Sequence, residues 1–221
     1  MRRIVGAVFV SLDGVMQAPG GPSEDPTGGF GLGGWLFDYF DEESGQVVDA
    51  LFAEPFDLLL GRRTYDIFAA YWPYTEGDNA SMGRRFDRAR KYVVTRGDQA
   101  LAWENSHRVD NLEALAGIKQ GEGTDLIIQG SSTLYPQILA AGMLDRLIVM
   151  TFPLTLGTGK RLFGEGTPAG TMRLVDHQVT RLGALIATYE PKGGVRPGSF
   201  GSEAPSPAEI ERQARMARGD W

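Results

Sequence analysis

The sequence predicts an α/β fold: a mostly parallel central sheet with an antiparallel edge strand and helices on both faces. Two observations support this prediction. Short apolar runs, typical of strands that are covered on both faces, alternate with helix-like segments along most of the chain. The alternation then ends in two consecutive strand-like segments, 171–179 and 182–190, joined by a turn around Arg181 and Gly183. Two strands joined so closely are expected to pair antiparallel.

The individual elements follow from local signals. Residues 3–10 form a buried strand, and residues 17–34, rich in glycine and proline, form a long surface loop of the kind that is often a lid or disordered. Proline ends two of the helices, at Pro55 and at Trp72-Pro73. The other expected elements are helix 42–53, strand 57–61, helix 64–71, a loop with a short helix over 75–90, strand 91–95, a short strand near 107–109, helix 111–119, strand 125–130, a helix from Thr133 to Gly142, and strand 146–152.

The composition changes after Pro191, so we expect one domain over residues 1–190 and an appendage over 191–221. Residues 191–207 are rich in glycine, proline and serine and are typical of a linker. Ser206-Pro207-Ala208-Glu209 matches a capping box with proline at the first helical position, which predicts a short helix. Its apolar stripe is thin. The helix is therefore either a frayed appendage or an arm that docks on a partner subunit.

Composition excludes several classes of function. The 221 residues carry a formal net charge of -6 and no strong basic patch, which argues against nucleic-acid binding. The absence of cysteine excludes disulfides and thiol catalysis and is consistent with a cytoplasmic location. No apolar segment is long enough to cross a membrane. His107 and His177 are isolated, so no metal site is expected.

Three of the expected strands end in polar turns. Leu58-Leu59-Leu60 runs into Gly61-Arg62-Arg63-Thr64, Tyr92-Val93-Val94 into Thr95-Arg96, and Leu126-Ile127-Ile128-Gln129 into Gly130-Ser131-Ser132-Thr133. In open α/β sheets, ligands bind outside the carboxyl ends of the strands. Backbone amides, hydroxyls and guanidinium groups gathered there would suit a polyanionic ligand. The pattern indicates a nucleotide-type cofactor.

Each turn has a structural alternative. Gly130-Ser131-Ser132-Thr133 can approach a pyrophosphate closely, or be an ordinary strand–turn–helix link; it matches no standard nucleotide motif. Arg62 and Arg63 can hold a phosphate or only solvate the start of a helix, although positive charge opposes the helix dipole there. Arg96 would suit the 2′-phosphate that distinguishes NADP from NAD.

Asp13 and two tryptophans are the candidates for chemistry and substrate contact. Asp13 ends the first strand, where its carboxyl would relay a proton if burial raised its pKa, or would simply cap an Asp-Gly turn. Trp35 and Trp72 are core or loop anchors by default, and both are also able to stack on a flat heterocycle.

Several of these segments together resemble a known family. The matching segments are residues 11–14, 61–65, 91–95, 130–134, 141–145 and 153–163. In this order they resemble the dihydrofolate-reductase-like superfamily, and more closely the branch with the reductase domain of bifunctional riboflavin biosynthesis proteins. The resemblance covers roughly residues 3–190.

The resemblance implies a single-domain fold, NADPH as hydride donor, and often a homodimer. It implies that Asp13 faces the nicotinamide and the substrate, and that Thr95 and Arg96 reach the adenosine 2′-phosphate. The remaining cofactor contacts that it implies are Gly61, Arg62, Arg63 and Thr64 for the phosphates and Gly130, Ser131, Ser132, Thr133 and Leu134 for the pyrophosphate.

The chain departs from the family pattern in two respects that bear on function. No clear match exists to the helix carboxylate with which true dihydrofolate reductases hold the pterin, although Asp41, Glu42 and Glu43 lie nearby in sequence. No zinc deaminase signature accompanies the domain. We therefore expect an NADPH-dependent reductase of a small heterocycle, pteridine-like or a ribosylamino-pyrimidine. The alternative is a non-catalytic module that binds a nucleotide or another small ligand on the same fold.

Overall fold

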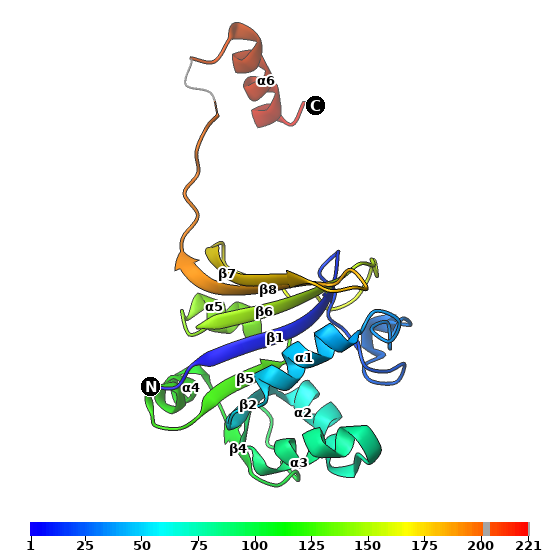
Figure 1. Cartoon of the computed structure of the whole chain (residues 1–221). Coiled ribbons are helices and arrows are strands. Elements are labelled where there is room, and N and C mark those ends of the chain that lie inside the picture. The colour runs from blue at the N-terminus through cyan, green and yellow to red at the C-terminus, as the bar shows by residue number, and fades with distance from the viewer. Residues whose placement is uncertain (201–203, 221) are drawn as a thin grey trace.

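A single mixed sheet organises the chain (Figure 1). The computed structural model describes residues 1–200 and 204–220. The strands are β1 (Ile4–Ser11), β2 (Phe56–Gly61), β3 (Lys91–Val94), β4 (Ser106–Val109), β5 (Asp125–Gln129), β6 (Arg146–Phe152), β7 (Thr171–Val179) and β8 (Leu185–Gly193). Their order in the sheet is β4-β3-β2-β5-β1-β6-β8-β7. The strands from β4 to β6 are parallel, and β8 and β7 add an antiparallel edge, which confirms the predicted fold class.

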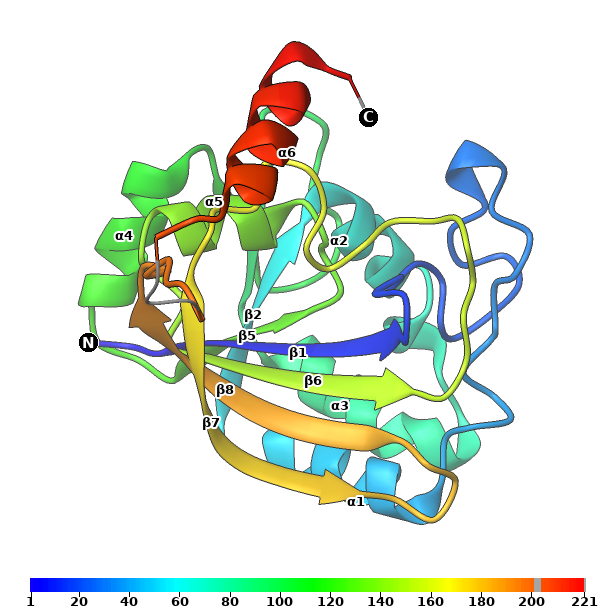
Figure 2. The same ribbon diagram turned by 90° about the horizontal axis from the view of Figure 1, so that it is seen from above.

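Helices cover both faces of the sheet (Figure 2). They are α1 (Glu42–Leu51), α2 (Arg62–Ala69), α3 (Ala80–Arg88), α4 (Leu112–Gln120), α5 (Leu134–Ala140) and α6 (Pro207–Arg218). Leu59 of β2 packs in a cluster with α4 and α5, whereas its neighbours Leu58 and Leu60 pack in a cluster with residues of α1, α2 and α3. This alternation is the two-residue period of a strand that is buried on both faces.

The loop after β1 follows a defined path over the sheet. Its Val15, Phe30 and Trp35 pack with Phe152 of β6 in a third core cluster. The Gln17 amide donates to the carbonyls of Asp25 (2.8 Å) and Thr27 (2.9 Å), and its Oε1 accepts from the Lys160 N–H (3.0 Å). Lys160 also forms an ion pair with Asp25. Residues 17–34, predicted as a long surface loop, are thus held in place by contacts of Gln17 and Lys160.

Several boundaries differ from those predicted by one to three residues; the last strand, for example, runs to Gly193 instead of residue 190. α2 begins at Arg62 instead of Thr64, because Gly61 takes the N-cap position in an extended conformation directly after the strand. The second strand of the hairpin begins at Leu185 instead of residue 182, because residues 180–184 form the turn and Gly183 has a φ of +84°. Glycine tolerates this left-handed conformation at little cost.

The helix after the linker forms where the capping box predicts it. The Ser206 hydroxyl accepts from the Glu209 N–H (3.2 Å), and Pro207 is the first helical residue. No residue of α6 is buried, and the helix lies apart from the sheet in Figure 1. The division into a domain over 1–190 and an appendage over 191–221 remains a prediction.

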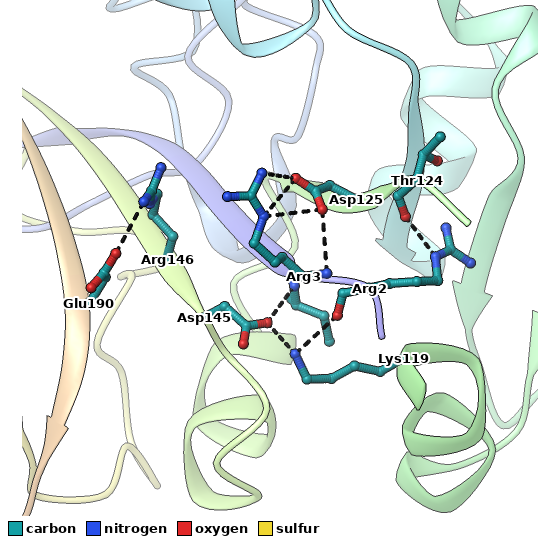
Figure 3. Close-up of polar contacts among 9 residues, drawn as sticks. Arg2, Arg3, Lys119, Thr124, Asp125, Asp145, Arg146 and Glu190 are labelled. Atoms are coloured by element: carbon teal, nitrogen blue, oxygen red, sulfur yellow. Dashed lines mark hydrogen bonds and ion pairs between the residues drawn. The ribbon is translucent and has the colours of Figure 1, made fainter. Parts of the chain in front are cut away.

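Charged residues at the amino ends of the strands pair with one another (Figure 3). The buried Arg2 guanidinium contacts Asp57 at 2.5 Å and donates to the Thr124 carbonyl at 2.7 Å. The more exposed Arg3 pairs with Asp125, also at 2.5 Å. Further pairs join Lys119 to Asp145 and Arg146 to Glu190. At this end of the sheet, Arg2, Arg3, Lys119 and Arg146 therefore each have a carboxylate partner.

Candidate functional site

A cavity of about 860 Å³ opens at the other end of the sheet, where β2 and β5 terminate. The turns that follow these two strands line it, together with residues 16–25 of the loop after β1 and Leu36. Ala7 and Phe9 of β1, residues of α2 and of the segment that follows it, and the distant Lys160 also contribute to the wall. The predicted site residues that line it are Gly61, Arg62, Arg63, Thr64, Trp72, Gly130, Ser131, Ser132 and Thr133.

The two turns are joined directly. The Gly61 N–H donates to the Ser131 hydroxyl (2.9 Å), and the Ser131 N–H donates to the Thr64 hydroxyl (3.0 Å). Gly130 and Ser131 both have left-handed backbone conformations, with φ of +74° and +60°. A Cβ on Gly130 would lie 3.2 Å from Thr64 Cγ2, which is closer than an ordinary contact. Glycine at 130 and hydroxyl residues at 64 and 131 therefore bring two turns, 70 residues apart in sequence, into one wall.

Of the two arginines at the start of α2, Arg62 already has partners within the protein. Arg62 Nε lies 2.8 Å from Asp66, and its terminal nitrogen donates to the Gln99 carbonyl at 3.1 Å. Arg63 is exposed, lines the cavity and forms no ion pair or side-chain hydrogen bond within the described residues. Its guanidinium is therefore available to a ligand at this wall.

The third strand end lies beside the cavity and outside its lining. β3 pairs with β2 so that Val94 is opposite Gly61. Thr95 is buried, and its hydroxyl accepts from the Gly97 N–H (3.2 Å), while Arg96 is exposed. The structure thus brings the three predicted strand ends to one edge, with Thr95 and Arg96 at its margin. Leu134, also predicted for the cofactor, packs its side chain in the core behind the turn.

Asp13 lies outside the cavity lining, and its carboxylate is held by hydrogen bonds. Oδ1 accepts from the Ser11 hydroxyl (2.6 Å) and the Leu156 N–H (3.0 Å), and Oδ2 accepts from the Gly157 N–H (2.8 Å). These bonds, chiefly that from Ser11, lower the pKa of Asp13 to about 2. A proton relay needs a raised pKa. The geometry favours the turn-capping alternative, with Asp13 joining the end of β1 to the loop after β6.

The two tryptophans have different environments. Trp35 is buried against Phe152, and its Nε1 donates to the Gln17 carbonyl (2.8 Å), so it anchors the loop behind the cavity. Trp72 lines the cavity, and its buried Nε1 finds no hydrogen-bond partner among the residues described. Trp72 is therefore the better placed of the two for a ligand.

Sequence reasoning missed several polar residues of the wall, among them Gln129, Lys160 and Glu24. Gln129, the last residue of β5, lines the cavity and has a buried Oε1 without a partner in the described chain. Lys160 and Glu24 come from loops, and burial raises the pKa of Glu24. A polar residue that ends an apolar strand was a signal for Gln129. No local pattern marks the other two.

The carboxylates near α1 are used elsewhere. Asp41 caps α1 by accepting from the Ser44 N–H (2.9 Å) and also accepts from the Leu182 N–H (3.1 Å), while Glu43 accepts from the Arg181 N–H (2.6 Å). They tie α1 to the β7–β8 turn, and neither lines the cavity. Over residues 1–200 and 204–220, no cluster of side chains suits a metal ion, and no helix is long and apolar enough to span a membrane.

Comparisons with known proteins agree with this architecture. The family model of the RibD C-terminal domain matches residues 2–186. The uncharacterized protein YyaP of Bacillus subtilis (strain 168) is 24% identical over 199 residues, which cover 87% of this chain and 96% of that protein.

Solved structures share the fold. A putative riboflavin biosynthesis protein from Shewanella sp. PV-4 superposes with a TM-score of 0.63 at 19% identity, over 86% of this chain and 99% of that one. The dihydrofolate reductase of Enterococcus faecalis, solved in complex with NADP(H) and RAB-propyl, superposes with a TM-score of 0.53 at 16% identity, over 86% and 96% of the two chains. These two neighbours show that the chain shares their fold.

Proposed function

The chain belongs to the RibD C-terminal domain family, and from this premise we propose that it is an NADPH-dependent reductase of a small heterocyclic substrate. The substrate would be pteridine-like or a ribosylamino-pyrimidine. The observation that carries the proposal is the wall formed by the β2 and β5 turns, with Arg63 beside it, unpaired among the described residues. An unpaired guanidinium next to glycine-rich turns suits a phosphate.

The residues of the cavity fit a dinucleotide. Gly61 and Gly130 both line the cavity at the turns where a pyrophosphate would approach, and Ser131, Ser132 and Thr133 continue the second turn. Gln129 and Trp72 both line the cavity, and Gln129 Oε1 and Trp72 Nε1 are an acceptor and a donor without a partner among the described residues. A cavity of about 860 Å³ is of the size that cofactor sites have.

The position of each residue suggests a role in binding the cofactor or the substrate. Arg63, Thr64 and the 130–133 turn would hold the phosphates, with Arg62 kept in place by Asp66, and Thr95 and Arg96 would reach the adenosine 2′-phosphate. When bound, NADPH supplies the hydride. Trp72 would pack on a ring, and Asp13 and Trp35 would support the site by fixing the loops around it. Orientation of the reactants is then the main contribution of the protein to rate.

The test is a titration with NADPH and NADH, followed by nicotinamide fluorescence. We expect NADPH to bind more tightly, and Arg96→Ala to weaken NADPH binding by roughly 1.5–3 kcal/mol while changing NADH binding little. Similar weak binding of NADPH and NADH would contradict the proposed phosphate-binding role of the arginines. An equal loss for both in Arg96→Ala would disprove its role at the 2′-phosphate.

The rival function is a non-catalytic binding module. One observation favours it: the α1 carboxylates are occupied by the β7–β8 turn, so they do not supply a pterin contact. Oxidation of NADPH in the presence of a panel of pteridines, pyrimidines and quinones separates the two functions. Turnover with any of them supports the reductase, and tight NADPH binding without turnover supports the module.

The homodimer and the cytoplasmic location are proposals that rest on the family and on composition. Exposed apolar side chains on the edge hairpin offer a surface for self-association, namely Leu174, Val179 and Leu185. Light scattering coupled to size exclusion should give twice the mass of the 24.1 kDa chain. A monomeric mass at micromolar concentration would contradict the dimer.

A further inference from the structure

Three carboxylates line the cavity, and two of them are already neutralised. Asp66 pairs with Arg62, and Asp25 pairs with Lys160. The third, Glu24, has no ion pair within residues 1–200 and 204–220 and accepts a hydrogen bond from the Gly20 N–H (2.7 Å). Among the described residues, Glu24 is thus the acid of the cavity whose charge no cation offsets.

Glu24 comes from a different segment of the chain than the residues proposed to hold the cofactor phosphates. Arg63 and the 130–133 turn lie at the tips of β2 and β5, whereas Glu24 lies on the loop after β1, and all of them line the same cavity. β1 is the next strand after β5 in the sheet, so a dinucleotide that runs from the β2–β5 tips across the sheet would place its far end toward this loop. The Gln17–Lys160 contacts that pin the loop also hold the segment with Glu24.

We propose that Glu24 is the proton donor of the reduction and that the substrate class is a neutral cyclic imine. This inference rests on the proposed function. In the step, the imine carbon accepts a hydride from NADPH, the C=N π pair moves to nitrogen, and nitrogen takes the Glu24 carboxyl proton. The products are the amine, NADP⁺ and the Glu24 carboxylate, which water reprotonates.

The electrostatics of the cavity agree with this role. Burial raises the pKa of Glu24 despite hydrogen bonds from the Gly20 and Gly21 backbone, and a raised pKa favours the protonated form that a proton donor needs. The other titratable or charged groups that line the cavity are Asp25, Arg62, Arg63, Asp66, Tyr71 and Lys160. The Arg62–Asp66 and Lys160–Asp25 ion pairs neutralise four of these charges. The phosphates of a bound dinucleotide would neutralise Arg63. No free cation then stabilises the Glu24 carboxylate within the described part of the chain.

The first measurement needs no turnover. Glutamate labelled with carbon-13 at the carboxyl is titrated by NMR, with Glu24→Gln assigning the Glu24 signal. We expect an elevated pKa and a shift of that signal when NADPH is added. An ordinary glutamate pKa, or an unmoved signal in the presence of bound NADPH, would overturn the role.

The second measurement compares two probes, 3,4-dihydroisoquinoline and its N-methyl iminium salt. The neutral imine needs a proton, and the iminium needs only a hydride. We expect Glu24→Gln to slow reduction of the imine by roughly 10²- to 10⁴-fold, to remove the fall in rate at high pH, and to spare the iminium. Glu24→Asp should restore part of the imine rate.

The outcomes distinguish this inference from the proposed function. Equal slowing of both probes, or no slowing, rejects Glu24 as proton donor. If wild type oxidises NADPH with a quinone and reduces neither probe, the imine class and the Glu24 role fail while the reductase stands. If NADPH does not bind at all, the proposed function fails.

Discussion

The two ends of the sheet handle charge in opposite ways. At the amino ends, Arg2 contacts Asp57, and Arg3 and Lys119 contact Asp125 and Asp145 (Figure 3). At the carboxyl ends, Arg63 and Glu24 line a cavity without an ion pair in the described residues. Both ends carry arginines and acids, so composition alone does not distinguish them. A buried charge pair is costly to break, whereas titratable groups without a partner around a cavity are available to a ligand.

The largest effect should come from breaking the buried pair at the amino end. Asp57→Asn leaves Arg2, whose side chain is 2% exposed, without its carboxylate. We expect a loss of about 3–5 kcal/mol in the free energy of unfolding, measured by urea denaturation. The matched control is Arg3→Ala, whose side chain is 59% exposed and should cost at most about 1 kcal/mol. Equal losses would end the distinction between the two pairs.

Next in size is the removal of the free arginine at the carboxyl end. Arg63→Ala should weaken NADPH binding roughly 10- to 150-fold by removing a charge-assisted contact. The urea midpoint should stay unchanged, because Arg63 has no partner in the described chain to lose. A stability loss with unaltered affinity would show that Arg63 belongs to the fold instead of the site.

The hydrogen bond from the Gly61 N–H to the Ser131 hydroxyl, which joins the two turns, should affect both stability and NADPH binding. Ser131→Ala leaves the Gly61 N–H without its acceptor, which should cost about 1–3 kcal/mol of stability and loosen the phosphate wall. The neighbouring Ser132 has no side-chain hydrogen bond within the described residues, so Ser132→Ala should change stability by less than about 0.5 kcal/mol. Indistinguishable urea midpoints for the two variants would contradict a stabilising role of the Gly61–Ser131 hydrogen bond.

The smallest effect should be the acid dependence that Asp13 confers. Its carboxyl pKa is about 2 in the folded chain against an ordinary value of 3.8, so the folded state binds fewer protons between these values. The stabilisation is therefore present above about pH 4 and is lost as the pH falls toward 2. Asp13→Asn should flatten this acid limb of stability and leave NADPH affinity unchanged. Loss of turnover alone, without any change in the acid limb, would restore the catalytic interpretation of Asp13.

Sequence predicted the strands and their polar ends because both signals are local. An apolar run followed by glycine and serine identifies β5 and its turn without knowledge of the rest of the chain. The contacts that assemble the cavity are not local. Gly61 meets Ser131 across 70 residues, and Lys160 meets Asp25 across 135. Which charges stay unpaired depends on contacts of this kind, so the unpaired state of Glu24 was not visible in the sequence. The i,i+4 spacing of Arg62 and Asp66, in contrast, was a local signal for their ion pair.

Amide hydrogen exchange with and without saturating NADPH tests the central contrast most directly. We predict slower exchange in residues 61–64 and 130–133, where the cofactor phosphates would lie, and unchanged exchange around residues 2–4, 125 and 145. Protection at the amino ends of the strands, or no protection at either end while NADPH binds, would contradict the assignment of the ligand to the unpaired charges.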